Sequence, residues 1–322
     1  MRVRRLAAWT ALPLAVTLGL AACGSGGDGG SGGSGSEAVS IQIAEPQHLV
    51  PTNTTETSGS QVLAGLFAPL VDYDAQNKPY EVAAESVTSS DNKVWTIKLK
   101  DGFTFHNGEK VTSDDYINAW NYGAYAPNGQ GGSYFFEKIA GYQDLQGEKP
   151  KAKEMSGLKK LDDLTFQVTL SEPYIDFKTM LGYNAFYPLP EAAFSAPGVL
   201  KDGYEQAPIG QGPFKMKGTW QHDSKIEVER YDAYPLEKPK VQSVEFRVYQ
   251  QLTAAYADVL ADNLDVLPTI PTENLSTAPT DLGDRYQTSP MSSFQFLAFP
   301  TFEKEYSNPD VRKAISMAID RD

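Results

Sequence analysis

The sequence has little of two residue types that build metal sites and covalent crosslinks. Among 322 residues there is one cysteine, Cys23, and there are three histidines, His48, His106 and His222. A single cysteine excludes a disulfide within the chain and a multi-cysteine metal site. The histidines lie far apart, and none has the spacing of a motif such as H-x-x-x-H. We therefore expect no metal and no cofactor.

Basic residues are also scarce relative to acidic ones. The chain has 28 Lys and Arg against 41 Asp and Glu, a formal net charge of −13. Nucleic acids and anionic lipid surfaces both favour clustered basic side chains. The charge makes the chain a poor candidate for either surface, and we expect no nucleic-acid partner. Its length fits about two domains, and 41% hydrophobic residues are enough for a core.

Motifs of covalent catalysis are missing from Ala38 onward, where no Gly-x-Ser-x-Gly nucleophile elbow occurs. His106 follows a strand pattern, and histidine is the most frequent general base, but no recognisable nucleophile accompanies it. Asp114 and Asp115 are typical of charges at a helix N-terminus, not of an acid–base pair. We expect a protein that is not an enzyme. A secreted hydrolase remains the less favoured alternative, which turnover of peptide would support.

The N-terminus reads as an export signal. Residues 1–22 contain three arginines, an apolar stretch from Leu6 to Leu20 and then small residues, the parts of a secretory signal peptide. The ending "LAAC" resembles the bacterial lipobox, in which the bond before the cysteine is cut and the cysteine is lipidated. We predict lipidation at Cys23 and a location on the outer face of the cell membrane. The alternative is a plain signal peptide, or an uncleaved anchor, with an incidental cysteine.

Residues 24–37 are almost entirely Gly and Ser, which predicts a flexible coil spanning roughly 20 Å. We interpret 23–37 as the lipidated cysteine and its tether. From Ala38 onward, hydrophobic alternation predicts strands, and helical periodicity predicts helices. The strands are expected at 39–43, 94–100, 164–170, 224–231, 244–249 and 292–299, and the helices at 61–73, 112–122 and 253–267, the last running into a strand.

Two local patterns refine this reading. Asp101–Gly102 and Asn107–Gly108 are turn dipeptides, and Thr112 with Asp115 forms a capping-box pattern. Gly210 and Gly212 lack the Lys-Ser/Thr of a phosphate loop, so we expect a turn leading into a strand. Strands and helices mix without a strict βαβ rhythm, which predicts an α/β protein with a mixed sheet.

Five blocks resemble the family 5 extracellular solute-binding proteins, which include the oligopeptide- and dipeptide-binding proteins of ABC importers. "LKDGFTFHNGEKVTSDDYINAW" is similar to the family's F-H-x-G-x-x-x-T-x-x-D block. Four more blocks follow the family's order: "AES", "PIGQGPFKMKGTW", "ADNLDVL" and "NPDVRKAISMAIDRD". The sequence departs from the family's usual Asn-Pro at Tyr231–Asp232, from its Trp at Pro235 and from its Gly at Ala261.

The resemblance implies a type II periplasmic-binding-protein-like fold with mixed sheets. Residues 38–290 would form the first lobe, with an inserted subdomain at about 60–180. Residues 291–322 would form the crossover strand and first helix of a second lobe that is only begun, so we interpret the chain as truncated. The apolar face of the last helix would then be poorly packed, with Ile315 and Ile319 unburied. The resemblance also makes His106 structural, bridging its hairpin to the following helix.

The resemblance implies a substrate-binding lipoprotein that captures peptide outside the cell and delivers it to the permease subunits of an importer. Its partners would be the peptide ligand, those permease subunits and the membrane through Cys23, and we expect a monomer. The same fold could bind an oligosaccharide, a nickel chelate or haem instead. A chain complete as given would bind peptide weakly or not at all. The expected ligand contacts are Glu45, Gln47, Tyr134, Phe294 and Phe296.

Overall fold

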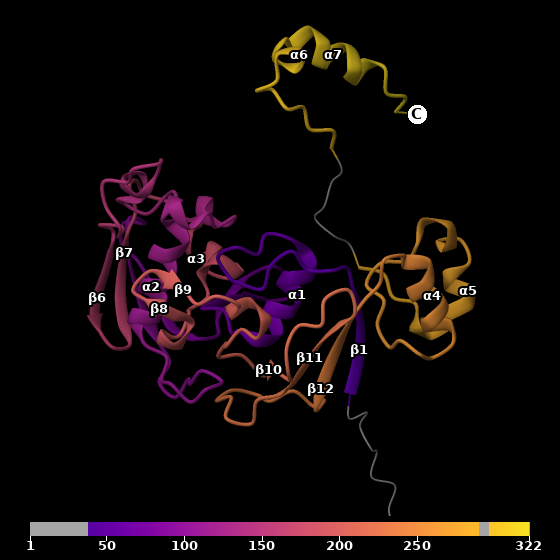
Figure 1. The fold of residues 1–322 in the computed structure, drawn as a ribbon, viewed down its shortest axis with the longest axis horizontal. Helices are drawn as coiled ribbons and strands as arrows, with labels where there is room; N and C mark the ends of the chain where they lie inside the picture. The colour runs from indigo at the N-terminus through magenta and orange to yellow at the C-terminus, as the bar shows by residue number, and fades with distance from the viewer. Residues whose placement is uncertain (1–37, 290–295, 322) are drawn as a thin grey trace, which may run out of the picture.

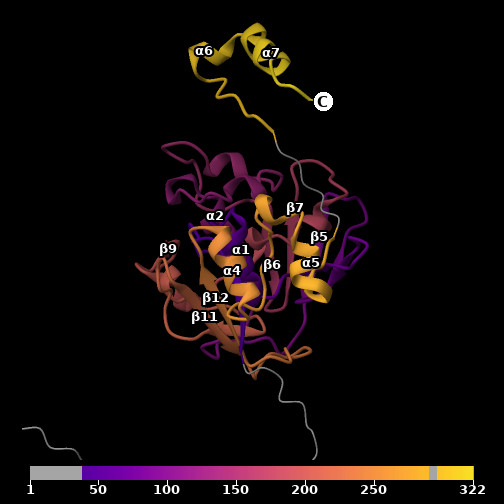
Figure 2. The same cartoon turned by 90° about the vertical axis from the view of Figure 1, so that its right-hand side faces the viewer.

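The computed structural model describes residues 38–289 and 296–321. The predicted signal peptide, Cys23, the tether and Phe294 lie outside these residues. The described residues form two four-stranded sheets, which we number by the order of their first strands in the chain. Across the molecule, Figure 1 shows the second sheet with α2 (Ser113–Ala124), then the first sheet with α1 (Thr57–Leu66), then α4 (Leu252–Leu260) and α5 (Ala278–Leu282). Figure 2 views the molecule from the side on which α4 and α5 lie. Within the described ranges, no helix combines the length and the hydropathy that crossing a membrane requires.

The first sheet joins the start of the described chain to a segment two hundred residues later. Its order is β1-β12-β11-β10, with β1 parallel to β12 and the other pairs antiparallel. Hydrophobic alternation predicted β1, β11 and β12, and each is confirmed. The strands are β1 (Ala38–Ile43), β10 (Phe214–Met216), β11 (Lys225–Arg230) and β12 (Ser243–Val248).

Helix α1 (Thr57–Leu66) covers this first sheet. Its buried Leu63 and Leu66 share a core with Phe246 of β12. The helix predicted to reach Tyr73 was wrong beyond Leu66, because residues 71–73 form strand β2. Pro69 explains the early end, since proline has no N–H and disfavours helix in the residue before it.

The second sheet has the antiparallel order β4-β5-β7-β6. Trp95, Ile97 and Leu99 of β5 are buried, as alternation predicted, and so are Phe166 and Val168 of β7. One face of the sheet is covered, so every second side chain enters the core. The strands are β4 (Ala84–Thr88), β5 (Val94–Leu99), β6 (Leu158–Asp162) and β7 (Thr165–Thr169).

Helix α2 (Ser113–Ala124) packs on this second sheet. Its Trp120 is fully buried, and the indole Nε1–H donates to the Phe186 carbonyl at 3.0 Å. The predicted capping box is confirmed: the backbone N–H and the hydroxyl of Thr112 donate to one oxygen of Asp115 at 2.7 and 2.9 Å. The helix start is therefore fixed by a local motif.

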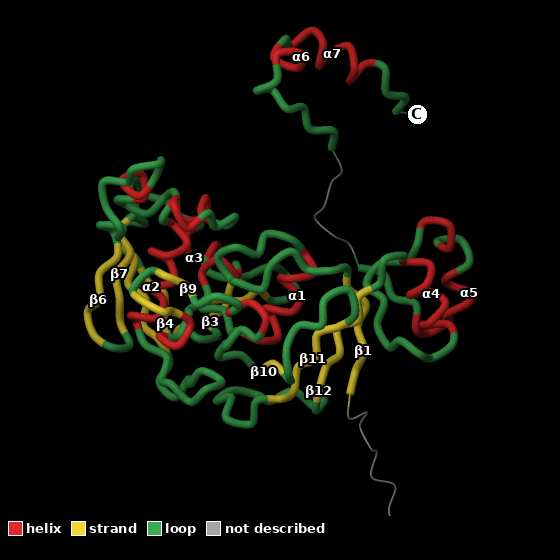
Figure 3. Tube along the Cα trace, viewed as in Figure 1, coloured by secondary structure: helices red, strands yellow, loops and turns green. Residues whose placement is uncertain are grey.

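Short elements complete the described chain (Figure 3). The predicted strand at the end of 253–267 is reduced to one parallel bridge between Val266 and Ile41. The remaining strands are β2 (Val71–Tyr73), β3 (Pro79–Glu81), β8 (Phe194–Ala196) and β9 (Val199–Leu200). The remaining helices are α3 (Phe177–Met180), α4 (Leu252–Leu260), α5 (Ala278–Leu282), α6 (Lys304–Ser307) and α7 (Pro309–Met317).

The last helix, α7, has no buried residue. Met317 is 74% exposed and Ile319 is 46% exposed, and Figure 1 shows α6 and α7 apart from both sheets. The prediction of a poorly packed terminal helix is therefore confirmed. The strand predicted at 292–299 was wrong over its described part, because residues 296–299 adopt no strand. A strand needs a partner backbone, and no described strand runs alongside them.

Candidate ligand-binding face

Three segments that are distant in sequence meet in the folded chain: the loop 44–56 after β1, the turn 130–136 and the turn 182–187. We call this surface the binding face. Hydrogen bonds join the first segment to each of the other two. The loop begins where β1 ends, so the parallel pairing of β1 with β12 determines where the face starts.

The turn 130–136 is fixed to the loop by its two glycines. The N–H of Gly131 donates to Asn53 Oδ1 at 2.7 Å, and the N–H of Gly132 donates to the Thr52 carbonyl at 2.9 Å. A Cβ at Gly132 would stand 2.7 Å from that same carbonyl oxygen. This close approach of two backbones explains the glycine.

Asn184 fixes the third segment. Its side chain is buried, and its Nδ2 donates to the carbonyls of Pro51 and Thr54, both at 2.8 Å. Both amide hydrogens are therefore satisfied inside the protein. Asn184 therefore supports the loop through its amide nitrogen.

An aromatic stack crosses from the second segment to the third. The Tyr134 and Phe135 ring centroids are 4.4 Å apart, those of Phe135 and Tyr183 are 4.1 Å apart, and both pairs are stacked. Tyr134 is 54% exposed and Tyr183 is 40% exposed. Partial burial, and then Tyr183, raises the pKa of the Tyr134 phenol. The stack offers large planar surfaces with few rotatable bonds to a ligand.

A cavity of about 410 Å³ opens beside Tyr183. One of its walls is the start of α1, with Thr57, Ser60 and Gln61, and another is Tyr187. The volume suits one large side chain or a short ligand segment. Exposed aromatic rings and hydrogen-bonding side chains therefore adjoin on this face.

Of the predicted contacts, Tyr134 lies in the stack with its ring exposed. The sequence interpretation missed Phe135 and Tyr183. Phe135 was visible as part of the run "SYFF", whereas Tyr183 carries no local signal. Phe296 is 73% exposed and belongs to none of the three segments. Ligand contact by Tyr134 and by Phe296 stays a prediction.

Glu45 lies at the start of the loop, but its carboxylate is engaged within the protein. One oxygen accepts from the His222 ring at 2.9 Å, and the other accepts from the Asp223 N–H at 3.0 Å. Gln47 is exposed, and its backbone N–H donates to Glu56 at 3.3 Å. A ligand can therefore reach Gln47, while Glu45 primarily ties the loop to the turn before β11.

His106 has both ring nitrogens occupied. Nε2–H donates to the Gly212 carbonyl at 3.3 Å, and Nδ1 accepts from the Gly210 N–H at 3.2 Å. Burial lowers the pKa of His106 to about 4, so the ring is neutral at pH 7. The structural interpretation holds, but its predicted partner was wrong. The ring bridges its hairpin to the glycine turn before β10, not to the following helix.

Metal-ligating side chains do not gather on the described residues. Within 38–289 and 296–321, no group of three or more His, Cys, Asp or Glu is placed to hold a metal ion. The three segments of the binding face carry amide, hydroxyl and aromatic side chains together with the carboxylates of Glu45 and Glu56.

The comparison with protein families matches residues 78–322 to the bacterial extracellular solute-binding proteins, family 5, middle region. The oligopeptide-binding protein OppA of Bacillus subtilis is 27% identical over 322 residues, covering 96% of this chain and 58% of OppA. The periplasmic murein peptide-binding protein MppA of Escherichia coli is 25% identical, covering 86% of this chain and 51% of MppA. The chain thus spans about half the length of these curated relatives.

Solved structures agree with the fold. A periplasmic oligopeptide-binding protein from Borrelia burgdorferi superposes with a TM-score of 0.77 at 26% identity. The superposition covers 88% of this chain and 57% of that one. The two sheets and their helices therefore share the fold of that solved structure.

Proposed function

The chain belongs to the bacterial extracellular solute-binding proteins, family 5, and on that premise we propose that it captures peptides outside the cytoplasm for an ABC-type importer. The observation that carries the proposal is the exposed stack of Tyr134, Phe135 and Tyr183 beside a small cavity. Peptide side chains pack well on rigid aromatic surfaces. Relatives whose names specify oligopeptide or murein-peptide binding support the choice of peptide.

The mechanism is binding without covalent chemistry. A peptide would lie along the loop 44–56, pair with exposed backbone as an added strand does, and place a side chain against Tyr134 and Tyr183. Gln47 would contact the ligand directly, and Glu45 would act through the loop that it holds. Phe294 and Phe296 would contribute from the segment that follows the first lobe. Enclosure would come from a second lobe closing on this face by hinge motion.

The cellular setting is part of the same proposal. The signal peptide would direct export and then be cleaved after residue 22, and a lipid on Cys23 would hold a monomer on the outer face of the cell membrane through the tether 23–37. Residues 38–290, with an inserted subdomain at about 60–180, would form the first lobe, and 291–322 would begin the second. The permease subunits of the importer would receive the ligand.

An oligosaccharide is the second candidate ligand, and the same stack favours it. Sugar rings pack on exposed aromatic faces much as peptide side chains do, and the cavity beside Tyr183 is lined by hydroxyl and amide groups. The peptide remains first because peptide ligands are named for the relatives and sugars are not. A nickel chelate or haem has no comparable feature in its favour on this face.

The test is a competition among solutes on the whole chain. The protein is equilibrated with a pool of short peptides and oligosaccharides, filtered, and its retained solutes are identified by mass spectrometry. The matched variant carries Tyr134→Ala and Tyr183→Ala. The control variant carries Tyr80→Ala, which removes an exposed tyrosine (46% exposed) outside the binding face.

We expect peptides to be retained by the protein and by the Tyr80 variant, and several-fold less by the double variant. Retention of sugars in place of peptides would contradict the peptide proposal and identify an oligosaccharide as the ligand. Equal peptide retention by all three proteins would overturn the assignment of the site to the stack. Hydrolysis of the retained peptides would revive the hydrolase alternative.

A further inference from the structure

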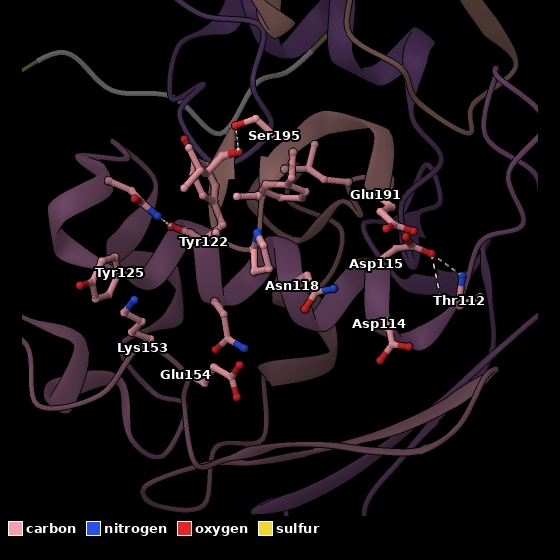
Figure 4. A pocket seen from close by; sticks show the side chains of 18 of the residues that line it. Thr112, Asp114, Asp115, Asn118, Tyr122, Tyr125, Lys153, Glu154, Glu191 and Ser195 are labelled. Atoms are coloured by element: carbon pink, nitrogen blue, oxygen red, sulfur yellow. Dashed lines mark hydrogen bonds between the residues drawn. The ribbon is translucent and has the colours of Figure 1, made fainter. Parts of the chain in front are cut away.

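A larger cavity lies on α2, away from the binding face. Its volume is about 1000 Å³, and it shares no lining residue with the cavity beside Tyr183. Helix α2 forms one wall, and the hairpin of β8 and β9 forms another (Figure 4). The size is that of a site for a small organic ligand, and the proposed peptide capture uses none of its residues.

The lining of this cavity is strongly acidic. Its two ammonium groups, Lys110 and Lys153, face a larger set of carboxylates, of which Asp114 is already paired with Lys160 at 2.7 Å. Excess negative charge around a concave site attracts cations and repels anions. The carboxylates are Glu109, Asp114, Asp115, Glu154 and Glu191.

Two carboxylates, Asp115 and Glu191, line one end of the cavity. The Leu189 N–H donates to the backbone carbonyl of Asp115 at 3.3 Å, which holds the segment that carries Glu191 against α2, and Figure 4 shows both side chains at this end. One Asp115 oxygen takes both Thr112 bonds, which leaves the other for a ligand. Burial raises the pKa of Asp115 to about 6, with further contributions from Glu109 and Asp114. An ammonium group here would relieve the repulsion between the carboxylates.

The helix dipole does not cancel this preference. The N-terminus of α2 contributes roughly half a positive charge, which is less than the charge of the acidic groups around it. The cavity end therefore stays negative, and it selects for a cation despite lying at a helix start.

A buried amide lies farther along the same helix. Asn121 is 8% exposed and lines the cavity. Its Oδ1 accepts from the Met155 N–H at 2.8 Å, which fixes the orientation of the amide. Its Nδ2 group has no hydrogen-bond partner among the described residues, so two donors are left for a ligand oxygen. Asn121 is six residues from Asp115, about 9 Å along a helix axis.

The wall at the Asn121 end of the cavity is partly apolar. Tyr122, the next residue along α2, packs edge-to-face on Phe194 of β8 with ring centroids 5.6 Å apart, and Tyr125 lies at the end of the helix. Tyr122 is buried and Tyr125 is half-buried. An aliphatic chain can lie along these rings, as the methylene stem of a long basic side chain does.

We propose that this cavity binds an organic cation with a primary amine at one end and an oxygen acceptor at the other, as a lysine residue in a short peptide has. The ammonium group lies between Asp115 and Glu191, the methylene chain extends along α2 toward the Tyr122 ring, and a carbonyl oxygen accepts from Asn121. A free aliphatic diamine shares the ammonium chemistry but lacks the oxygen.

Calorimetric titration of the whole chain tests the proposal with three probes: Nα-acetyl-lysine amide, cadaverine and Nα-acetyl-norleucine amide. The cavity variant carries Asp115→Asn and Glu191→Gln, since asparagine keeps an oxygen for the Thr112 bonds. The control variant carries Glu85→Gln and Glu172→Gln, which remove two exposed carboxylates outside the cavity. Circular dichroism and urea unfolding establish that both variants fold.

We expect the lysine derivative to bind at least tenfold more tightly than the norleucine derivative. The cavity variant should lose at least tenfold in affinity, while the control variant and Tyr183→Ala should change it less than twofold. Tighter binding of the lysine derivative than of cadaverine supports a lysine residue as the ligand and Asn121 as its oxygen partner. Equal affinity for the lysine derivative and cadaverine would overturn the role of Asn121 and identify a free amine as the ligand.

Equal binding of the norleucine derivative, or affinity unchanged in the cavity variant, would overturn the proposal. The Tyr183→Ala variant separates the two sites: it should reduce peptide retention on the binding face and leave this cavity intact. Loss of lysine binding in that variant alone would assign the signal to the binding face and refute the second site.

Discussion

The carboxylate of Glu45 and the imidazole of His222 lie 2.9 Å apart, although 177 residues separate them in the chain. The carboxylate can accept but not donate, so Nδ1–H of the ring is the donor. With the Asp223 N–H on its other oxygen, Glu45 connects the loop of the binding face to the turn before β11. A residue expected to hold a ligand thus also holds the site together.

We expect Glu45→Gln to lower the free energy of unfolding by about 1 kcal/mol, because charge-assisted hydrogen bonds exceed neutral ones but this pair is partly exposed. Urea unfolding at pH 7 measures the change. Glu85→Gln is the matched control, since Glu85 forms a half-exposed pair with Lys98 at 2.7 Å and should change little. Equal losses in the two variants would contradict a specific role for Glu45.

His106 should make the protein sensitive to acid. Its pKa is lowered from 6.5 to about 4 by burial, so between these values the unfolded chain binds a proton that the folded chain does not. Stability is therefore fully present above pH 6.5 and is lost as pH falls toward 4, by about 3 kcal/mol at most. His106→Gln removes the titration while keeping a donor and an acceptor.

Urea midpoints of the protein and of His106→Gln at several pH values between 7.5 and 4 check this prediction. The difference between the two proteins should shrink as the pH falls. Asp115, with its raised pKa, changes stability in the opposite direction between pH 4 and 6, but it is present in both proteins and cancels. A difference independent of pH would refute the assignment to His106.

Asn184→Ala should destabilise the protein by about 2–3 kcal/mol, because it leaves the buried carbonyls of Pro51 and Thr54 without their donor. Asn118→Ala is the control: Asn118 is exposed on α2, where alanine favours the helix slightly. Chemical denaturation compares the two. A similar small change in both would mean that the loop does not depend on Asn184.

The sequence predicted most of the two sheets because burial on one face has a period of two. Trp95, Ile97 and Leu99 show this period directly and are all buried. The capping box of α2 was equally visible, since Thr112 and Asp115 interact within one turn. What could be predicted rests on contacts between residues that are close in the sequence.

The rest depends on contacts across long sequence separations. His106 was predicted to bridge its hairpin to the following helix, but its hydrogen-bond partners lie 104 and 106 residues further on. The stack of Phe135 on Tyr183 joins two turns that no local pattern connects. Tyr134 was found through the family resemblance, whereas Tyr183 needed the packed structure. The sequence can predict features of each of the three segments, but it does not predict that they contact one another.

Gly210 is constrained by a residue that is distant in the sequence, because its backbone packs directly against Leu66. A Cβ at this position would stand 1.9 Å from the Leu66 carbonyl oxygen at the end of α1, far inside contact distance, so the backbone would have to move. The Gly210 N–H also donates to His106. We expect Gly210→Ala to destabilise the protein by about 3 kcal/mol or more, as overpacking against rigid backbone does.

The matched control is Gly65→Ala, one residue before Leu66 in α1. Its Cβ would meet the Phe214 side chain at 3.8 Å, an ordinary contact, and alanine is favoured over glycine inside a helix by about 1 kcal/mol. We therefore expect this variant to be neutral or slightly more stable. Thermal unfolding compares the melting temperatures of the two variants. If Gly210→Ala melts at the same temperature as Gly65→Ala, the turn before β10 does not require glycine for its packing against α1.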